Sequence, residues 1–204
     1  MDTYYPAFIC CSALVGLSAM PGAERWLARL EVRRAGLAAC GLLYGLALWL
    51  YFLHPEWPTP VWGMGVTALA VAGAVRQVAW PRRLRAVSIG LLVGWSALRL
   101  WTEHPFLLWH GLPTVWLLSA ASGLGLLGAA DRPRERVLSL AGLALGVLTG
   151  RWLDGGPSAP WSADVAGMAP ACNVVWLTAL MVLLWSAFGT GGRRAAEGRP
   201  RPSI

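Results

Sequence analysis

The stretch from Leu98 to His110 carries residue types that commonly do chemistry. Between two long apolar runs it holds one arginine, one glutamate and two histidines: Arg99, Glu103, His104 and His110. Histidine titrates near neutral pH, and an arginine inside a membrane protein marks either an anion site or a helix end at the lipid headgroups. The cluster therefore predicts a polar site or a set of interface anchors.

Two further ionisable residues, Arg151 and Asp154, stand at the end of a later apolar run. They are three residues apart, and Arg99 and Glu103 are four apart, so the members of each pair can meet on a helix. One hypothesis is an outward-facing pocket in which the two arginines bind an anionic group. The other, which we favour, is that both arginines extend to the headgroups beside a local partner.

No motif in the sequence predicts a metal, a cofactor or a catalytic centre. The histidines lack HxH or HExxH spacing, the four cysteines lack CxxC spacing, and neither GxSxG nor a P-loop is present. All 17 basic residues are arginine, which excludes a lysine Schiff base. We expect no bound metal or cofactor and favour a protein that is not an enzyme.

The composition is that of a membrane protein. Of the 204 residues, 56% are hydrophobic and 13% charged, whereas soluble domains carry about 25% charged residues. A helix crosses the hydrocarbon with about 20 apolar residues. The pattern predicts an all-α, polytopic transmembrane helix bundle over residues 1–189, with about seven spans: residues 4–20, 35–53, 61–78, 86–101, 106–130, 137–153 and 168–188.

The arginines are distributed unevenly among the segments that connect these spans. Fifteen lie in residues 21–34, 76–85, 131–136 and the tail after residue 189. The alternate connections contain none: residues 54–60, 102–105 and 154–167. Because arginine-rich loops stay in the cytoplasm, the alternation predicts an outside N-terminus and a cytoplasmic C-terminus in the plasma membrane. It also explains the net charge of +7 without nucleic acid.

The two arginine-rich ends of the chain differ in pattern. In residues 23–34, Trp26, Leu27 and Leu30 recur at helical spacing with Arg25 and Arg29 between them. This favours equally a short amphipathic helix on the anionic inner leaflet and a plain basic loop. Residues 190–204 are rich in glycine, arginine and proline and are predicted to form a disordered cytoplasmic tail.

Small residues and prolines predict how the spans pack. Gly142, Gly146 and Gly150 line one face of the sixth span and allow a close helix approach, within the chain, as we favour, or in a homodimer. Pro113 predicts a kink in the fifth span. His54-Pro55 and His104-Pro105 lie 50 residues apart, which indicates either chance or a duplicated hairpin of the kind found in transporters.

These patterns favour a non-enzymatic accessory protein, sensor or assembly component of the plasma membrane. Its expected partners are the lipid bilayer, with anionic lipids at the cytoplasmic face, and a protein partner or second copy. The alternative is a small transporter whose outward-facing site is formed around Arg99, Glu103 and His104. An outer-face enzyme using Glu103 and His104 is the least favoured hypothesis.

Overall fold

The computed structural model describes residues 4–30, 32–55, 57–75, 78–103, 114–155 and 165–188. In these ranges the chain is helical, apart from one isolated antiparallel bridge between Val32 and Val75, which confirms the predicted all-α class. The described helices are α1 (Tyr5–Ala19), α2 (Ala23–Leu30), α3 (Arg34–Leu53), α4 (Thr59–Ala74), α5 (Trp80–Glu103), α6 (Thr114–Ala129), α7 (Pro133–Gly155) and α8 (Val165–Phe188).

Proline and the apolar runs together determine where helices begin. Leucine and alanine, which dominate the runs, are among the strongest helix formers. Prolines stand in the first turns of α1, α4, α5 and α7, where the missing N–H has no intrahelical partner to lose. One proline, Pro170, lies inside α8.

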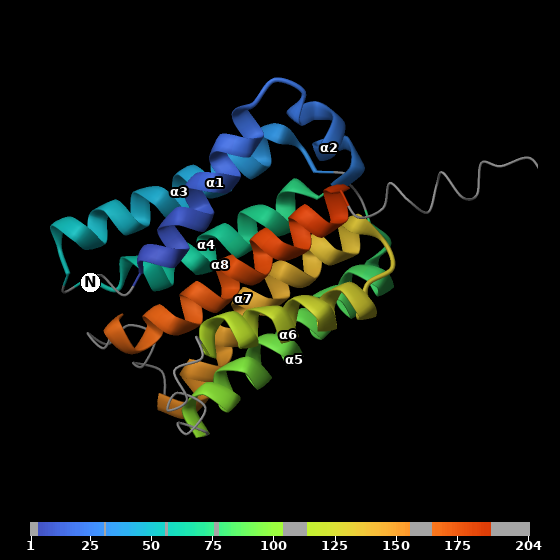
Figure 1. The fold of residues 1–204 in the computed structure, drawn as a ribbon. Helices are drawn as coiled ribbons and strands as arrows, with labels where there is room; N and C mark the ends of the chain where they lie inside the picture. Colours follow the sequence, from blue (N-terminus) through green and yellow to red (C-terminus); the bar gives the residue numbers. More distant parts are fainter. Residues whose placement is uncertain are drawn as a thin grey trace, which may run out of the picture.

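All the helices except α2 lie side by side, and each runs opposite to the one before it, so that α5 and α7 run in the same direction (Figure 1). The short helix α2 turns away from α1 by 103° and lies across one end of the bundle. Gly22 makes this turn with φ of +85°, a left-handed conformation that glycine adopts without strain. Leu27 and Leu30 are buried beneath α2, whereas Arg25 and Arg29 are exposed, so this segment is an amphipathic helix and not a plain loop.

Three helical segments are long and apolar enough to cross a membrane: Ala35–Leu53, Pro133–Leu153 and Met168–Phe188. The bent pair α1–α2 is a fourth if it counts as one broken span. The helices α4 and α6 are apolar but shorter; the 16 residues of α4 extend about 24 Å against a hydrocarbon core of about 30 Å. The fold is therefore compatible with a membrane protein.

Helix boundaries differ from the predicted spans mainly at the arginine-rich end. The predicted span 86–101 corresponds to α5, which begins at Trp80, and the predicted span 61–78 corresponds to α4, which ends at Ala74. Several arginines predicted in connections consequently lie in the first turns of α5 and α7, because prolines at 81 and 133 start these helices early. Residues 104–113, with Pro113, and residues 190–204 lie outside the described residues.

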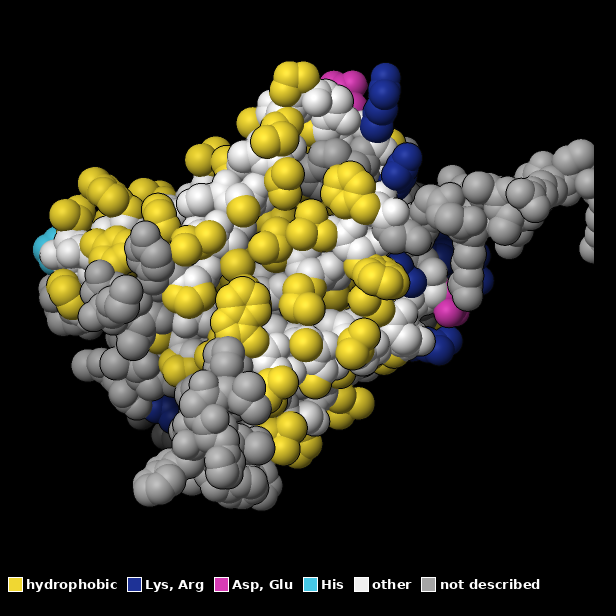
Figure 2. Space-filling model, in the orientation of Figure 1, with side chains coloured by type: hydrophobic (Ala, Val, Ile, Leu, Met, Phe, Trp, Pro, Cys, Tyr) yellow, Lys and Arg dark blue, Asp and Glu magenta, His cyan; other side chains and the backbone are white. Residues whose placement is uncertain are grey.

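Large apolar side chains cover the outside of the bundle. Leu69 and Leu124 are among the most exposed, at 67% and 70%. Figure 2 shows apolar side chains across the middle of the visible face, with most of the arginines gathered at one end. A soluble monomer rarely exposes so continuous an apolar surface, whereas lipid tails contact one without penalty.

Candidate functional site

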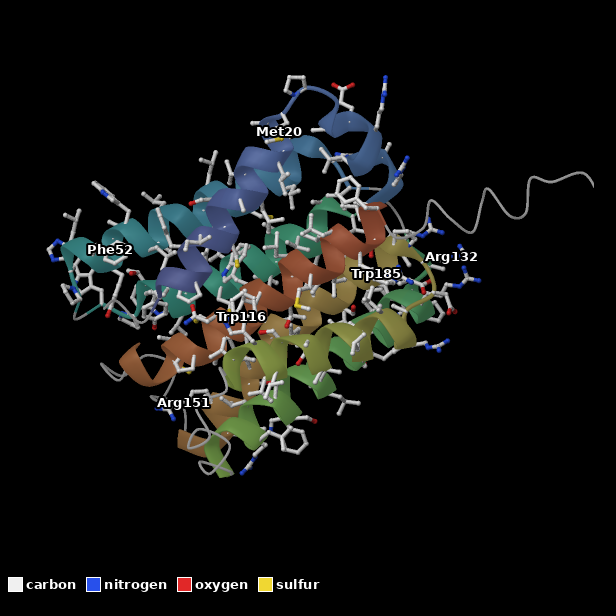
Figure 3. All side chains as sticks on the ribbon, viewed as in Figure 1. Met20, Phe52, Trp116, Arg132, Arg151 and Trp185 are labelled. Carbon is white, nitrogen blue, oxygen red and sulfur yellow. The ribbon has the colours of Figure 1, made fainter. Side chains whose placement is uncertain are left out.

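Arg99 and Arg151, predicted to bind an anion, lie on α5 and α7 toward the same end of the bundle. This end is opposite the one that carries Arg132, as the labelled residues in Figure 3 show for Arg151. Both arginines are half-buried. The Arg99 guanidinium carbon lies 5.8 Å from the centre of the Trp95 ring, within the range of about 6 Å for a cation–π contact.

The acidic and histidine members of the predicted cluster fall at the edge of the described residues. Glu103 is the last residue of α5 and Asp154 lies in the last turn of α7, but the positions of their side chains are not described. His104 and His110 lie outside the described residues. The pairs Arg99–Glu103 and Arg151–Asp154 therefore stay predictions, as does the outward-facing pocket.

The predicted glycine face of α7 lies directly against α5, and these two helices make the most extensive contact in the bundle. A Cβ atom added to Gly142 would lie 3.0 Å from the carbonyl carbon of Val87, and one added to Gly146 would lie 2.9 Å from that of Leu91. At Gly150 the added atom would meet the side chains of Trp95 and Leu98 at 2.8 Å. At Gly142 and Gly146 the backbones approach too closely for any side chain, whereas at Gly150 the limit is set by neighbouring side chains.

A second glycine stripe, on α5, completes this contact and was missed in the sequence. A Cβ atom at Gly90 would lie 2.8 Å from the backbone nitrogen of Leu143, and one at Gly94 would lie 3.0 Å from its carbonyl carbon. The signal was available, because Ala86, Gly90 and Gly94 follow one another at intervals of four residues. Two small-residue stripes thus face each other, backbone to backbone.

Three arginines cap the C-terminal ends of helices at the arginine-rich end. A helix leaves its last four carbonyl groups without intrahelical partners, and its C-terminus attracts positive charge. The bonds, with donor–acceptor distances of 2.9, 3.0 and 2.9 Å, run from Arg29 to the Ala187 carbonyl, from Arg83 to that of Ala72 and from Arg136 to that of Ala130. Arg29 thus caps α8, Arg83 caps α4 and Arg136 caps α6.

The first turn of α1 is held by a side chain from the last helix. Asn173 of α8 is buried, and its Oδ1 accepts a hydrogen bond of 3.0 Å from the backbone N–H of Ala7. That N–H is one of the four that a helix start leaves without a partner. Asn173 therefore joins α1 to α8 inside the bundle.

An apolar cavity of about 70 Å³ lies between the α1–α3 side of the bundle and α4, α7 and α8. Its walls include Leu14, Cys40, Met64 and Ala141, and the buried Thr67 hydroxyl makes no hydrogen bond within the described residues. Apolar cavities in proteins stay dry and accept hydrocarbon. The lining of this cavity offers no charged group to an ion.

A polar cavity of about 210 Å³ opens at the arginine-rich end, where α5 begins, α6 ends and α7 begins. Its charged lining residues are Arg82, Arg85, Asp131, Arg132 and Glu135. The sequence placed these residues in two separate connections, and nothing in their spacing indicated that the fold brings them to one pocket.

No protein-family model, curated protein or solved structure matches this chain.

Proposed function

We propose that this chain is a seven-span integral protein of a bacterial plasma membrane, with its N-terminus outside and its C-terminus in the cytoplasm. We further propose that it acts as a non-enzymatic accessory or assembly component. The observation that carries the membrane placement is the polarity of the bundle: exposed apolar side chains surround the helices, and arginines gather at one end (Figure 2). That end is the cytoplasmic one in this proposal.

The interior of the bundle supports a scaffold role. Among the described residues the buried polar side chains are uncharged, and several bond to backbone carbonyls on other helices. Thr59 donates to Ala47 over 2.8 Å, and Thr178 donates to Ser119 over 3.3 Å. Such bonds fasten helices to one another within hydrocarbon, where water offers no alternative partner.

Single-cysteine labelling tests the topology. We would place one cysteine at position 56, 103, 132 or 195 in a cysteine-free chain and apply a membrane-impermeant maleimide to intact cells. We expect labelling at 56 and 103 only, with 132 and 195 labelled after the membrane is opened. Outside labelling at 132 or 195 would contradict the proposed orientation.

Photo-crosslinking tests the accessory role. A photoreactive amino acid would replace Trp116 on α6, Leu42 on α3 or Leu69 on α4, all of which are exposed (Figure 3 labels Trp116). An accessory protein should give one protein adduct from one of these faces, identified by mass spectrometry. Lipid adducts alone from all three positions would contradict a helix-to-helix partner.

A transporter is the second candidate, and the observation that favours it is the pair of half-buried arginines on adjoining helices, Arg99 and Arg151. A panel of carboxylate, phosphate and sulfonate anions would be screened for uptake into proteoliposomes. A transporter should take up at least one anion, and Arg99→Ala and Arg151→Ala should abolish that uptake while Arg132→Ala does not. Absence of uptake of every anion by the wild type, in vesicles with confirmed insertion, would exclude anion transport through this cluster.

A further inference from the structure

The polar cavity at the arginine-rich end has an excess of positive charge. Three arginines and two carboxylates line it, and its apolar floor contains Ala86 and Ile89 of α5 with Ala129 and Ala130 at the end of α6. The neighbouring Arg83 and Arg136 are occupied elsewhere as helix caps. At the starts of α5 and α7, the capping arginines and the pocket arginines are thus different residues.

The pocket arginines make no ion pair within the described part of the chain. Arg82, Arg85 and Arg132 are exposed, and Asp131 and Glu135 form no ion pair with them within the described residues. Arginine presents several N–H donors in a planar fork that matches a phosphate group. Three such forks around a cavity of this size leave room for a phosphate and its substituents.

The position of the pocket adds two further features. The positive N-terminal ends of α5 and α7 lie at it together with the C-terminal end of α6, whose Ala130 carbonyl is already capped by Arg136, and this balance favours an anion. Trp80 and Leu84, one turn apart on α5, expose large apolar side chains at the same end of the bundle, on a face of the helix that does not line the pocket. A lipid fits this site because the proposed membrane placement puts it at the level of the headgroup phosphates, from which acyl chains continue into the hydrocarbon.

We propose that this pocket binds the headgroup of an anionic phospholipid of the phosphatidylglycerol type. Arg82, Arg85 and Arg132 bind the phosphodiester, and Glu135 and Asp131 accept hydrogen bonds from the headgroup hydroxyls. The proposal rests on the proposed membrane placement, which puts this end at the cytoplasmic leaflet. It goes further by assigning one discrete lipid site instead of a general attraction between arginines and anionic lipid.

Native mass spectrometry of the full-length protein in detergent tests the site, with equimolar phosphatidylglycerol, phosphatidylserine and phosphatidylcholine as probes. We expect the wild type to retain phosphatidylglycerol preferentially and Arg82→Gln/Arg132→Gln to lower that occupancy by about tenfold, because each arginine supplies a charge-assisted bond. The matched control is Arg25→Gln/Arg33→Gln, which removes the same charge from exposed arginines outside the pocket. It should retain the wild-type preference.

A second variant checks the headgroup chemistry independently of total charge. Glu135→Gln should reduce the discrimination between phosphatidylglycerol and phosphatidic acid, since phosphatidic acid lacks the hydroxyls. The detergent unfolding midpoint of each variant shows whether it is folded, and the single variant Arg132→Gln replaces the double variant if that one unfolds. Unchanged discrimination in Glu135→Gln would overturn the assignment of the carboxylates.

Three outcomes would overturn the lipid site. Equal loss of lipid from the pocket double variant and the control double variant would indicate a general electrostatic attraction between the arginines and anionic lipid, and no discrete site. Displacement of phosphatidylglycerol by millimolar inorganic phosphate, with the same dependence on Arg82 and Arg132, would indicate a free-phosphate site. If the protein resists carbonate extraction but shows no lipid preference, only the proposed lipid site is contradicted. If carbonate releases the protein from the membrane, the proposed membrane placement is contradicted as well.

Discussion

At the scale of single residues, the arginines of one end perform a structural task that the positive-inside rule does not describe. Arg29 reaches the carbonyl end of α8, which is distant in sequence, and Arg83 and Arg136 each reach the carbonyl end of the helix that precedes their own. The charge that would orient the chain in the proposed membrane placement also satisfies helix ends. The sequence predicted the side of the membrane for these residues but could not predict the carbonyls, because these depend on how the helices are arranged.

Arg136→Gln should destabilise the protein by about 1–3 kcal/mol, because the side chain bonds both the Ala130 carbonyl and the Ser186 hydroxyl. The matched control is Arg25→Gln, an exposed arginine outside the pocket, which should change stability by less than about 0.5 kcal/mol. Unfolding in mixed micelles of increasing dodecyl sulfate measures both. Equal midpoints for the two variants would contradict the capping role.

Asn173→Ala should cost about 1–3 kcal/mol, since it leaves the Ala7 N–H buried without its acceptor. The control is Thr149→Val, which removes a hydroxyl bonded to Leu145 and Gly146 within its own helix and should have a small effect. The same unfolding assay applies. Proteolysis of the N-terminal segment should accelerate only in Asn173→Ala.

At the scale of elements, the contact between α5 and α7 is the tightest feature of the bundle. Each helix supplies glycines where the other presents its backbone. In lipid, where hydrophobic attraction between helices is absent, such close approach is a principal source of helix association. The α7 stripe was read from the sequence, and its partner on α5 was visible in the same way, but sequence spacing alone does not show which two stripes face each other.

Gly146→Ala should destabilise the protein by about 1–3 kcal/mol, because the new methyl group meets the Leu91 backbone and the helices must separate. Gly125→Ala on α6 is the control: a Cβ there meets nothing within 4 Å, and alanine is the better helix former. It should be neutral or stabilising by up to about 1 kcal/mol. A Gly146→Ala protein as stable as Gly125→Ala would show that the stripes are not in close contact.

How well each helix could be predicted from the sequence depended on its own apolar residues, prolines and charges. Apolar runs and first-turn prolines identify most of the helices, and the spacing of Leu27 and Leu30 identified α2 as one of two alternatives. The start of α5 was placed six residues late because Arg82, Arg83 and Arg85 were taken as loop residues. Arginine is itself a good helix former, so charge alone does not end a helix.

At the scale of the whole molecule, the bundle buries its cysteines and exposes large apolar side chains. All four cysteines (Cys10, Cys11, Cys40 and Cys172) are at most 3% exposed, whereas leucines and tryptophans cover the outside. This inversion of the soluble pattern is what lipid as a solvent requires. The apolar composition predicted this exposed apolar surface. The outward-facing pocket depends on residues 104–110 and stays a prediction.

The native cysteines should therefore react very slowly with N-ethylmaleimide while the protein is folded in lipid. We expect less than one adduct per chain by intact mass, and four after denaturation in dodecyl sulfate, one for each cysteine. Slow reaction follows from burial, because the reagent must reach the sulfur atom. Rapid modification of Cys172, which is fully buried on α8, would contradict the packing of α8 against α1 and α3.

The bond from Ala7 to Asn173 spans 166 residues, almost the full described length of the chain. During synthesis α1 emerges before α8. The N–H of Ala7 therefore has no access to the Asn173 side chain until α8 has been made. A chain truncated before residue 173 never supplies that acceptor. The bond that holds the start of α1 therefore forms only after residue 173 has been synthesised.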